Sequence, residues 1–127
     1  MKSVRYGFIL CLMILTSCSQ ASGPTTSITS KPPDARETLA LEPDADIFQL
    51  DGAIYQANVE WVEELELTKK ERIGEIMHQT QNADEFQNET ATVLQVGSII
   101  YSTNEGGGYV LVDVDGKLIN YLLLTEG

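Results

Sequence analysis

The alternation of apolar and polar residues in the last fifth of the chain predicts a β-hairpin. Segments 109–114 and 117–124 both alternate, and Asp115-Gly116 lies between them. An Asp-Gly pair readily adopts the positive φ angles of a two-residue type I′ turn. Pairing Val114 with Lys117 then fixes which residues share a face of the sheet. The expected core face carries Val110, Val112, Val114, Ile119, Tyr121 and Leu123, and the opposite, mixed face carries Leu111, Asp113, Leu118, Asn120 and Leu122.

The same turn signal occurs earlier, where Asp51-Gly52 separates two short apolar segments. A two-residue turn at this point predicts a second hairpin with one apolar face. The expected strands are 47–50 and 53–56, with Phe48 opposite Tyr55 and Leu50 opposite Ala53.

Weaker patterns predict further strands. Segments 91–96 and 98–102 are separated by a turn at Gly97, and a glycine-rich loop follows at 104–108. Segment 59–79 is ambiguous, because part of it fits helical spacing while Leu65-Glu66-Leu67 alternates as a strand does. The strand interpretation is favoured, and the helical one stays open. The expected elements are strands from Glu60 to about Leu67 and around Arg72–Met77, then a polar loop at 79–90.

These elements together predict a mainly β domain over residues 46–127. We expect a small antiparallel sheet or a partly open barrel of about five to seven strands, because short strands with regular turn signals favour such folds.

The N-terminal apolar run has a different character. Residues 8–15 are continuously apolar and follow Lys2 and Arg5, which are the only charges in the first 30 residues. A basic head and an apolar stretch of about 7–15 residues are typical of a secretory signal. The run is shorter than the roughly 20 apolar residues of a membrane-spanning helix. We therefore expect residues 1–17 to be a signal peptide.

A linker is predicted between the signal and the β domain. Residues 18–45 are rich in Ser, Thr and Pro, and they show no apolar periodicity before Leu39. Such a composition gives little reason to fold, so we expect a flexible tether. A short helical turn at 35–42 is the alternative.

The residues that end the apolar run, Leu15-Thr16-Ser17-Cys18, resemble the lipobox of bacterial lipoproteins. The resemblance implies cleavage between Ser17 and Cys18 and lipidation of the Cys18 thiol. Acyl chains such as palmitate would hold the protein on the extracytoplasmic face of the cell membrane, since two chains anchor stably where one does not. Cys11 would leave with the signal, so the exported protein would have no disulfide.

The exported part also resembles a family. The strings 72–76, 91–101 and 110–116 are similar to those of small lipoproteins of Bacillus-type Gram-positive bacteria. One departure is Ser98, where that family has Thr after Val-Gly. The resemblance implies an envelope location and a small exported domain, and it implies no activity, cofactor or catalytic residue.

Charge narrows the class of partner. The chain has 19 acidic and 8 basic residues, a net charge of −11, and every acid follows residue 33. Removing Lys2 and Arg5 with the signal leaves six basic residues and a net charge of −13. This argues against a nucleic-acid binder, which needs basic side chains to neutralise phosphates. It favours cationic partners.

No catalytic or metal-binding signature emerges, so we expect no cofactor. His78 is the only histidine, which disfavours both a zinc site and a Ser-His-acid triad. Carboxylate neighbours such as Glu63 and Glu64, or Glu66 and Glu71, are interpreted as a solvated acidic face. Acid–base catalysis by such a pair is the alternative.

Three aromatic residues are candidates for a binding surface. Trp61 lies near Tyr55 and Val59 in the sequence, and it is interpreted as a core residue. The alternative is an aromatic platform on the surface. Tyr101 and Tyr109 flank the glycine-rich loop and are candidates for the same platform.

The sequence therefore predicts a membrane-anchored, extracytoplasmic, non-catalytic binding module. Its partner would be a cationic peptide, a protein or another envelope component. Two alternatives are a small carboxylate-dependent envelope enzyme and a structural accessory subunit of a membrane complex. The accessory subunit would show an exposed apolar patch around Leu111, Leu118 and Leu122.

Overall fold

The structure, a computed structural model, describes residues 31–125, which lie in one folded unit. Within this part of the chain, no helix has the length and apolarity needed to cross a membrane. The elements in chain order are α1 (Ala35–Leu41), β1 (Ile47–Leu50), β2 (Ala53–Gln56), α2 (Glu60–Glu63), β3 (Lys69–Glu75), β4 (His78–Gln79), the 3₁₀ helix η3 (Ala83–Glu85), β5 (Thr90–Ala91), β6 (Ile99–Thr103), β7 (Tyr109–Val114) and β8 (Lys117–Leu123).

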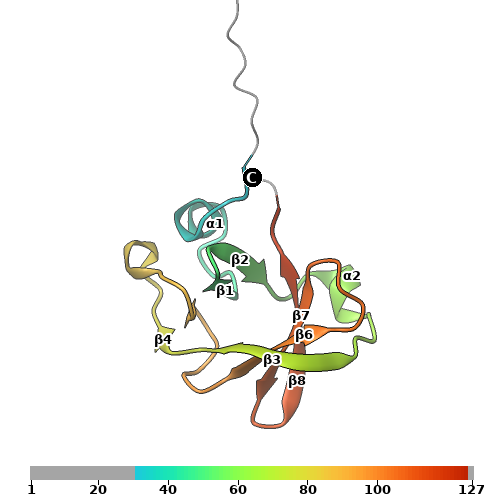
Figure 1. The fold of residues 1–127 in the computed structure, drawn as a ribbon. Coiled ribbons are helices and arrows are strands. Elements are labelled where there is room, and N and C mark those ends of the chain that lie inside the picture. The colour runs from blue at the N-terminus through green and yellow to red at the C-terminus, as the bar shows by residue number, and fades with distance from the viewer. Residues whose placement is uncertain (1–30, 126–127) are drawn as a thin grey trace, which may run out of the picture. The chain divides into compact units, whose positions relative to one another are not determined.

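The strands form one eight-stranded sheet in the order β3-β6-β7-β8-β2-β1-β5-β4. All neighbouring pairs are antiparallel except β4 and β5, which are parallel. The outermost strands β3 and β4 follow each other in the chain, with only Ile76 and Met77 between them, and the sheet curls into a half-barrel (Figure 1). The prediction of a mainly β fold is confirmed. The sheet is mixed, however, and its strand number exceeds the five to seven expected.

Both predicted hairpins are confirmed in position and register. Val114 pairs with Lys117 across the β7–β8 turn, and Leu50 pairs with Ala53 across the β1–β2 turn. Asp51 has a φ of 51° and Asp115 has a φ of 53°, and the glycine after each also has a positive φ. These are the angles that a type I′ turn requires, and they explain why Asp-Gly occupies both turns.

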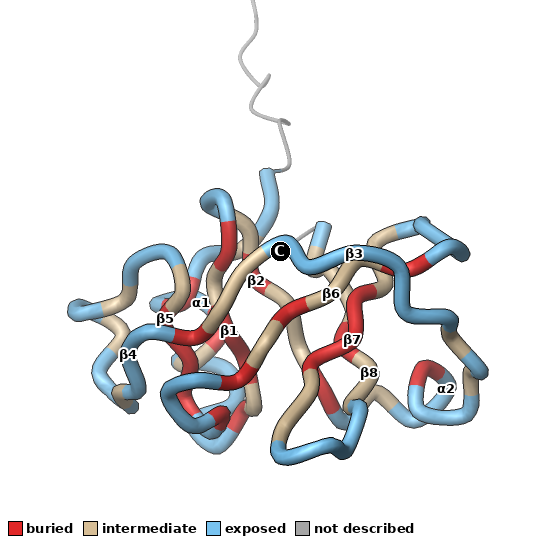
Figure 2. Tube along the Cα trace, turned by 60° about the horizontal axis from the view of Figure 1, so that its bottom comes forward, coloured by how far each residue is buried: buried red, intermediate tan, exposed pale blue. Residues whose placement is uncertain are grey.

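Figure 2 shows which positions along the strands are buried. Of the predicted core face, Val110, Val112 and Tyr121 belong to one buried apolar cluster and Val114 and Ile119 pack against it, whereas Leu123 is outside it. Phe48 is at its centre, stacked on Tyr55 and edge-on to Tyr121, with ring centroids 5.0 Å apart in each pair. Such pairs add about 0.5–1.5 kcal/mol to the burial of the rings. The buried residues of this cluster are Phe48, Leu50, Ala57, Ile76, Ala91, Leu94, Ile100, Val110, Val112 and Tyr121, with Val114 and Ile119 partly buried against it.

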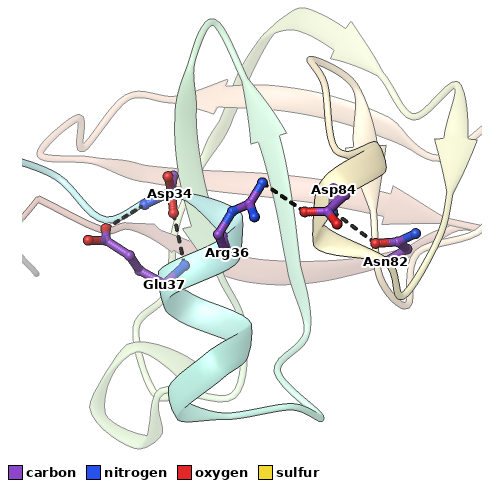
Figure 3. Close-up of polar contacts among 5 residues, drawn as sticks. All are labelled: Asp34, Arg36, Glu37, Asn82 and Asp84. Atoms are coloured by element: carbon purple, nitrogen blue, oxygen red, sulfur yellow. Dashed lines mark hydrogen bonds and ion pairs between the residues drawn. The ribbon is translucent and has the colours of Figure 1, made fainter.

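The opposite face is covered at the β1–β2 end by α1 and η3. Ala35 and Leu39 of α1 pack on Ile47 and Ile54. An exposed ion pair of 2.7 Å between Arg36 and Asp84 joins the two helices (Figure 3). Exposed pairs of this kind contribute about 0–1 kcal/mol. The apolar cluster is therefore what attaches α1.

This packing corrects the expected domain boundary. Residues 35–45 were predicted to belong to a flexible linker, but α1 is folded on the sheet. Asp34 accepts a hydrogen bond from the amide of Glu37, and the Glu37 carboxylate accepts one from the amide of Asp34 (Figure 3). This capping box satisfies free amides at the helix start. The helical turn weighed as an alternative is present. Residues 18–30 of the expected linker lie outside the described part of the chain.

Two other expected strands are wrong. Residues 60–67 form the short helix α2 and a turn, and after β5 the chain from Thr92 to Gly97 is bends and turns. Carbonyls in the latter segment accept hydrogen bonds from side-chain amides of Gln79 and Gln81. Side chains thus replace the strand neighbour that the apolar pattern implied. The loop expected at 79–90 contains η3 and borders β4 and β5.

Candidate functional site

The sheet opens where β2 departs from β8. Tyr55 and Gln56 pair with Leu123 and Leu122, and no further residue of β2 pairs with β8. Asn58 has a φ of 62°, a left-handed conformation that turns the chain away from the sheet. The first half of β8 is therefore left without a strand on this side among residues 31–125.

An open cleft of about 380 Å³ lies at this gap. Two carboxylates, Asp46 and Glu63, belong to its lining, and Lys117 is the basic residue there. The wall that contains Glu63 continues as an acidic segment, with exposed carboxylates also at 60, 64 and 66. The full lining is Asp46, Asn58, Glu63, Leu65, Lys117, Leu118, Ile119 and Asn120.

Asp46 connects the cleft to the core. The buried Tyr121 donates a 2.6 Å hydrogen bond from its hydroxyl to Asp46 Oδ1. Partial burial raises the pKa of Asp46, and the hydrogen bond from Tyr121 opposes that rise by favouring the ionised form. Burial and the neighbouring Asp46 both raise the pKa of Tyr121, so this phenol stays a donor. The site is thus a half-buried carboxylate held in place by a buried hydroxyl.

Asn120 fixes the opposite wall. Its Nδ2 donates hydrogen bonds of 2.9 Å to the carbonyl of Val62 and 3.0 Å to that of Leu65. Val62 is 1% exposed, so α2 is held by an apolar contact and by this side-chain cap. α2 has only four residues and no side-chain N-cap, so the side-chain amide of Asn120 adds a polar restraint on the helix that contains Glu63.

The three aromatic candidates lie on the face of the sheet that α2 covers. Trp61 is 54% exposed, so the interpretation as a core residue is wrong. Its ring meets Tyr109 edge-on at 6.2 Å. Tyr101 lies on the same face of the neighbouring strand, because it pairs with Leu111, and Lys69 Nζ is 4.4 Å from its ring centroid. The structure therefore brings Trp61 and Tyr109 together, while Lys69 covers Tyr101.

The remaining sequence candidates form no common site among the described residues. Ser17 and Cys18 lie outside the described residues. His78 is exposed on the two-residue strand β4, and residues 31–125 contain no group of three potential metal ligands. The apolar patch expected of an accessory subunit is incomplete, because Leu111 is 2% exposed while Leu118 is 42% exposed.

Sequence reasoning missed the cleft. Asp46 and Tyr121 are 75 residues apart in the chain, and neither belongs to a motif. The available signal was Asn58, two residues after the predicted strand 53–56, because asparagine tolerates the left-handed conformation that turns the chain.

The comparisons with known proteins bear on the chain as a whole. No protein-family model, curated protein or solved structure matches it.

Proposed function

We propose that the protein is a lipid-anchored, non-catalytic binding module of the cell envelope that recognises a cationic partner. The lipobox-like residues 15–18 support export and anchoring through Cys18. The acids that follow residue 33 support the sign of the partner, because a net charge of −13 on the exported part attracts cations and repels anions.

The cleft beside β8 is the observation that carries the proposal. It combines Asp46 and Glu63 with an exposed apolar side chain, Leu118, and an open strand edge. Carboxylates at the rim of a concave site steer cationic groups toward it, and an apolar floor adds contact area.

Titration calorimetry of the full-length protein in detergent tests this proposal, with decalysine as probe and decaglutamate as control. We expect decalysine alone to bind, with an affinity that falls about tenfold or more between low and high salt, since salt screens exposed charges beyond about 10 Å at 0.1 M. Glu63→Gln should weaken binding, while Glu85→Gln in η3 is the matched control. Binding that ignores salt, or no binding of decalysine, contradicts the proposal.

A second candidate function is a small envelope enzyme that uses a carboxylate. It is favoured by the raised pKa of Asp46, which shares a cleft with Glu63. Turnover of amide, ester or glycoside model substrates that is abolished in Asp46→Asn would support it. Absence of turnover across all three classes would leave the binding module.

A further inference from the structure

We propose that the partner binds as an extended segment that adds a strand to the open edge of β8 at Leu118 and Asn120, with a basic side chain between Asp46 and Glu63. This inference rests on the proposed function, and it adds the mode of binding and the class of ligand.

The backbone of β8 offers the hydrogen bonds. Val114 and Lys117 close a two-residue turn and form a hydrogen-bonded pair, so Ile119 and Tyr121 also direct their backbone groups toward β7. Leu118 and Asn120 direct theirs to the other side. β2 reaches that side only at Leu122 and Leu123, so within residues 31–125 no strand lies opposite Leu118 and Asn120.

The other sheet edges are protected, and this one is not. β3 carries the charged run Lys69-Lys70-Glu71-Arg72, and its pairing with β6 is interrupted by two register shifts. β4 has only two residues. Charges, irregularities and short length are the devices that keep an edge from pairing with another chain. The edge of β8 beside the gap instead carries the exposed side chain of Leu118, and it adjoins the cleft.

The cleft is preorganised for a guest strand. The amide of Ala57 donates to the carbonyl of Asp46 at 2.9 Å, which holds the end of the β1–β2 hairpin beside the gap. Asn120 holds α2 on the other side through the carbonyls of Val62 and Leu65. A site with fixed walls loses little conformational entropy on binding. Main-chain bonds then give affinity and the side-chain pocket gives selectivity, as in strand addition generally.

The charge of the cleft rim favours a basic ligand. Asp46 and Glu63 leave the cleft rim acidic against the single Lys117 of the lining. A second copy of this chain could offer the same β8 edge, but two exported bodies of −13 each repel one another. The open half of β8 adjoins the β7–β8 turn, at the opposite end of the folded unit from α1 (Figure 1). Because the cleft rim is acidic and two copies of this chain repel one another, a basic extended segment is the ligand that the site fits best.

Two peptides separate strand addition from simple charge attraction. The first is acetyl-Lys-Val-Lys-Val-Lys-Val-amide, and the second has the same side chains but is N-methylated at every backbone amide. Amide hydrogen exchange of the isotope-labelled full-length protein in detergent is the site-specific readout, and calorimetry gives the affinities.

We expect the first peptide to slow exchange at the amides of Leu118 and Asn120 at least tenfold, and the methylated peptide to bind at least tenfold more weakly without slowing it. Glu63→Gln should weaken the first peptide, and Glu85→Gln should not. Leu118→Pro removes one outward amide without touching the β7 ladder and should abolish protection at Asn120.

Equal binding of both peptides without protection of Leu118 and Asn120 would overturn strand addition while leaving cationic recognition intact. Protection along β3 would overturn the site. If neither these peptides nor decalysine binds, the proposed function fails as well. The peptide comparison in the wild-type protein decides the matter even if Leu118→Pro does not fold.

Discussion

At the residue scale, the contact between Tyr121 and Asp46 joins the core to the candidate site. The phenol ring lies in the hydrophobic cluster, and the hydroxyl ends on the carboxylate at the cleft. A buried hydroxyl without a partner would destabilise the fold by about 1–3 kcal/mol. Asp46 therefore stabilises the fold as the acceptor for the Tyr121 hydroxyl, in addition to its proposed role in binding.

The raised pKa of Asp46 predicts a pH dependence. Because the folded state favours the protonated form, the stability from this group is full below its ordinary pKa of 3.8 and is lost as the pH rises through the raised value. Asp46→Asn keeps an acceptor for Tyr121 and removes the titration. We expect the stability of the variant relative to wild type to increase from pH 3 to pH 7, modestly because solvent screens a half-exposed group.

Urea unfolding at several pH values measures this difference, with Glu85→Gln as a control at an exposed carboxylate. A relative stability that falls as the pH rises would show that the Tyr121 hydrogen bond outweighs burial at Asp46.

Thr92 is a second residue with a decisive hydroxyl. It is 3% exposed, donates to the carbonyl of Ala45 at 2.7 Å and accepts from the amide of Ile47 at 3.0 Å. Thr92→Val keeps the shape but leaves both backbone groups unpaired, so we expect a loss of about 2–4 kcal/mol in the free energy of unfolding. Thr92→Ser keeps the hydroxyl and loses only a buried methyl group, so we expect a loss of about 1 kcal/mol or less. Equal losses in denaturant titrations would assign the effect to packing alone.

At the element scale, the sequence predicts those strands whose determinants are local. Asp51-Gly52 and Asp115-Gly116 fix both hairpins, because turn type and register follow from two adjacent residues. The α1 helix was detectable for the same reason, since its cap lies between Asp34 and Glu37. Its apolar partners Ile47 and Ile54 lie on other elements, which explains why it was assigned to the linker.

The mispredicted elements depend on distant partners. Leu65 and Leu67 alternate as strand residues do, yet the preceding helix is held by Asn120, 55 residues from Leu65. Thr92 and the exposed Val93 belong to an apolar run that side-chain hydrogen bonds keep irregular. Tertiary contacts of this kind override local propensity. The parallel pairing of β4 with β5 has no local signal at all.

The loop between β6 and β7 predicts a contrast between two glycines. Gly106 and Gly108 both have positive φ, of 62° and 87°. A Cβ on Gly106 would meet nothing within 4 Å, whereas one on Gly108 would lie 3.1 Å from Leu123 Cβ. We expect Gly106→Ala to cost about 1 kcal/mol for backbone strain, and Gly108→Ala about 1–3 kcal/mol more for the contact.

Thermal unfolding of the two variants checks the contrast. Because Gly108 also accepts a 2.8 Å hydrogen bond from the amide of Leu123, its replacement should loosen the end of β8. Equal losses in both variants would mean that the loop relaxes away from Leu123.

At the scale of the whole molecule, the candidate site was beyond sequence reasoning although the fold class was not. The aromatic candidates were chosen by residue type, and only Trp61 and Tyr109 are in contact. The cleft depends on how far β2 follows β8, which is set by the turn at Asn58 and by a hydrogen bond spanning 75 residues. Composition gives the net charge of the chain, which is a property of the sum, and the proposal of a cationic partner rests on it.

The distribution of charge also predicts how the protein is retained at the membrane. Residues 18–127 have a net charge of −13, which anionic lipid surfaces repel, so under the proposal the anchor at Cys18 must supply the attachment by itself. We expect Cys18→Ala to lose labelling by radioactive palmitate. The amount of the variant in the membrane fraction should fall at least tenfold relative to wild type. Cys11→Ala, seven residues earlier in the proposed signal, is the matched control and should keep both properties. Palmitate labelling that survives in Cys18→Ala would contradict the lipobox assignment, and membrane retention without labelling would place the attachment in another segment.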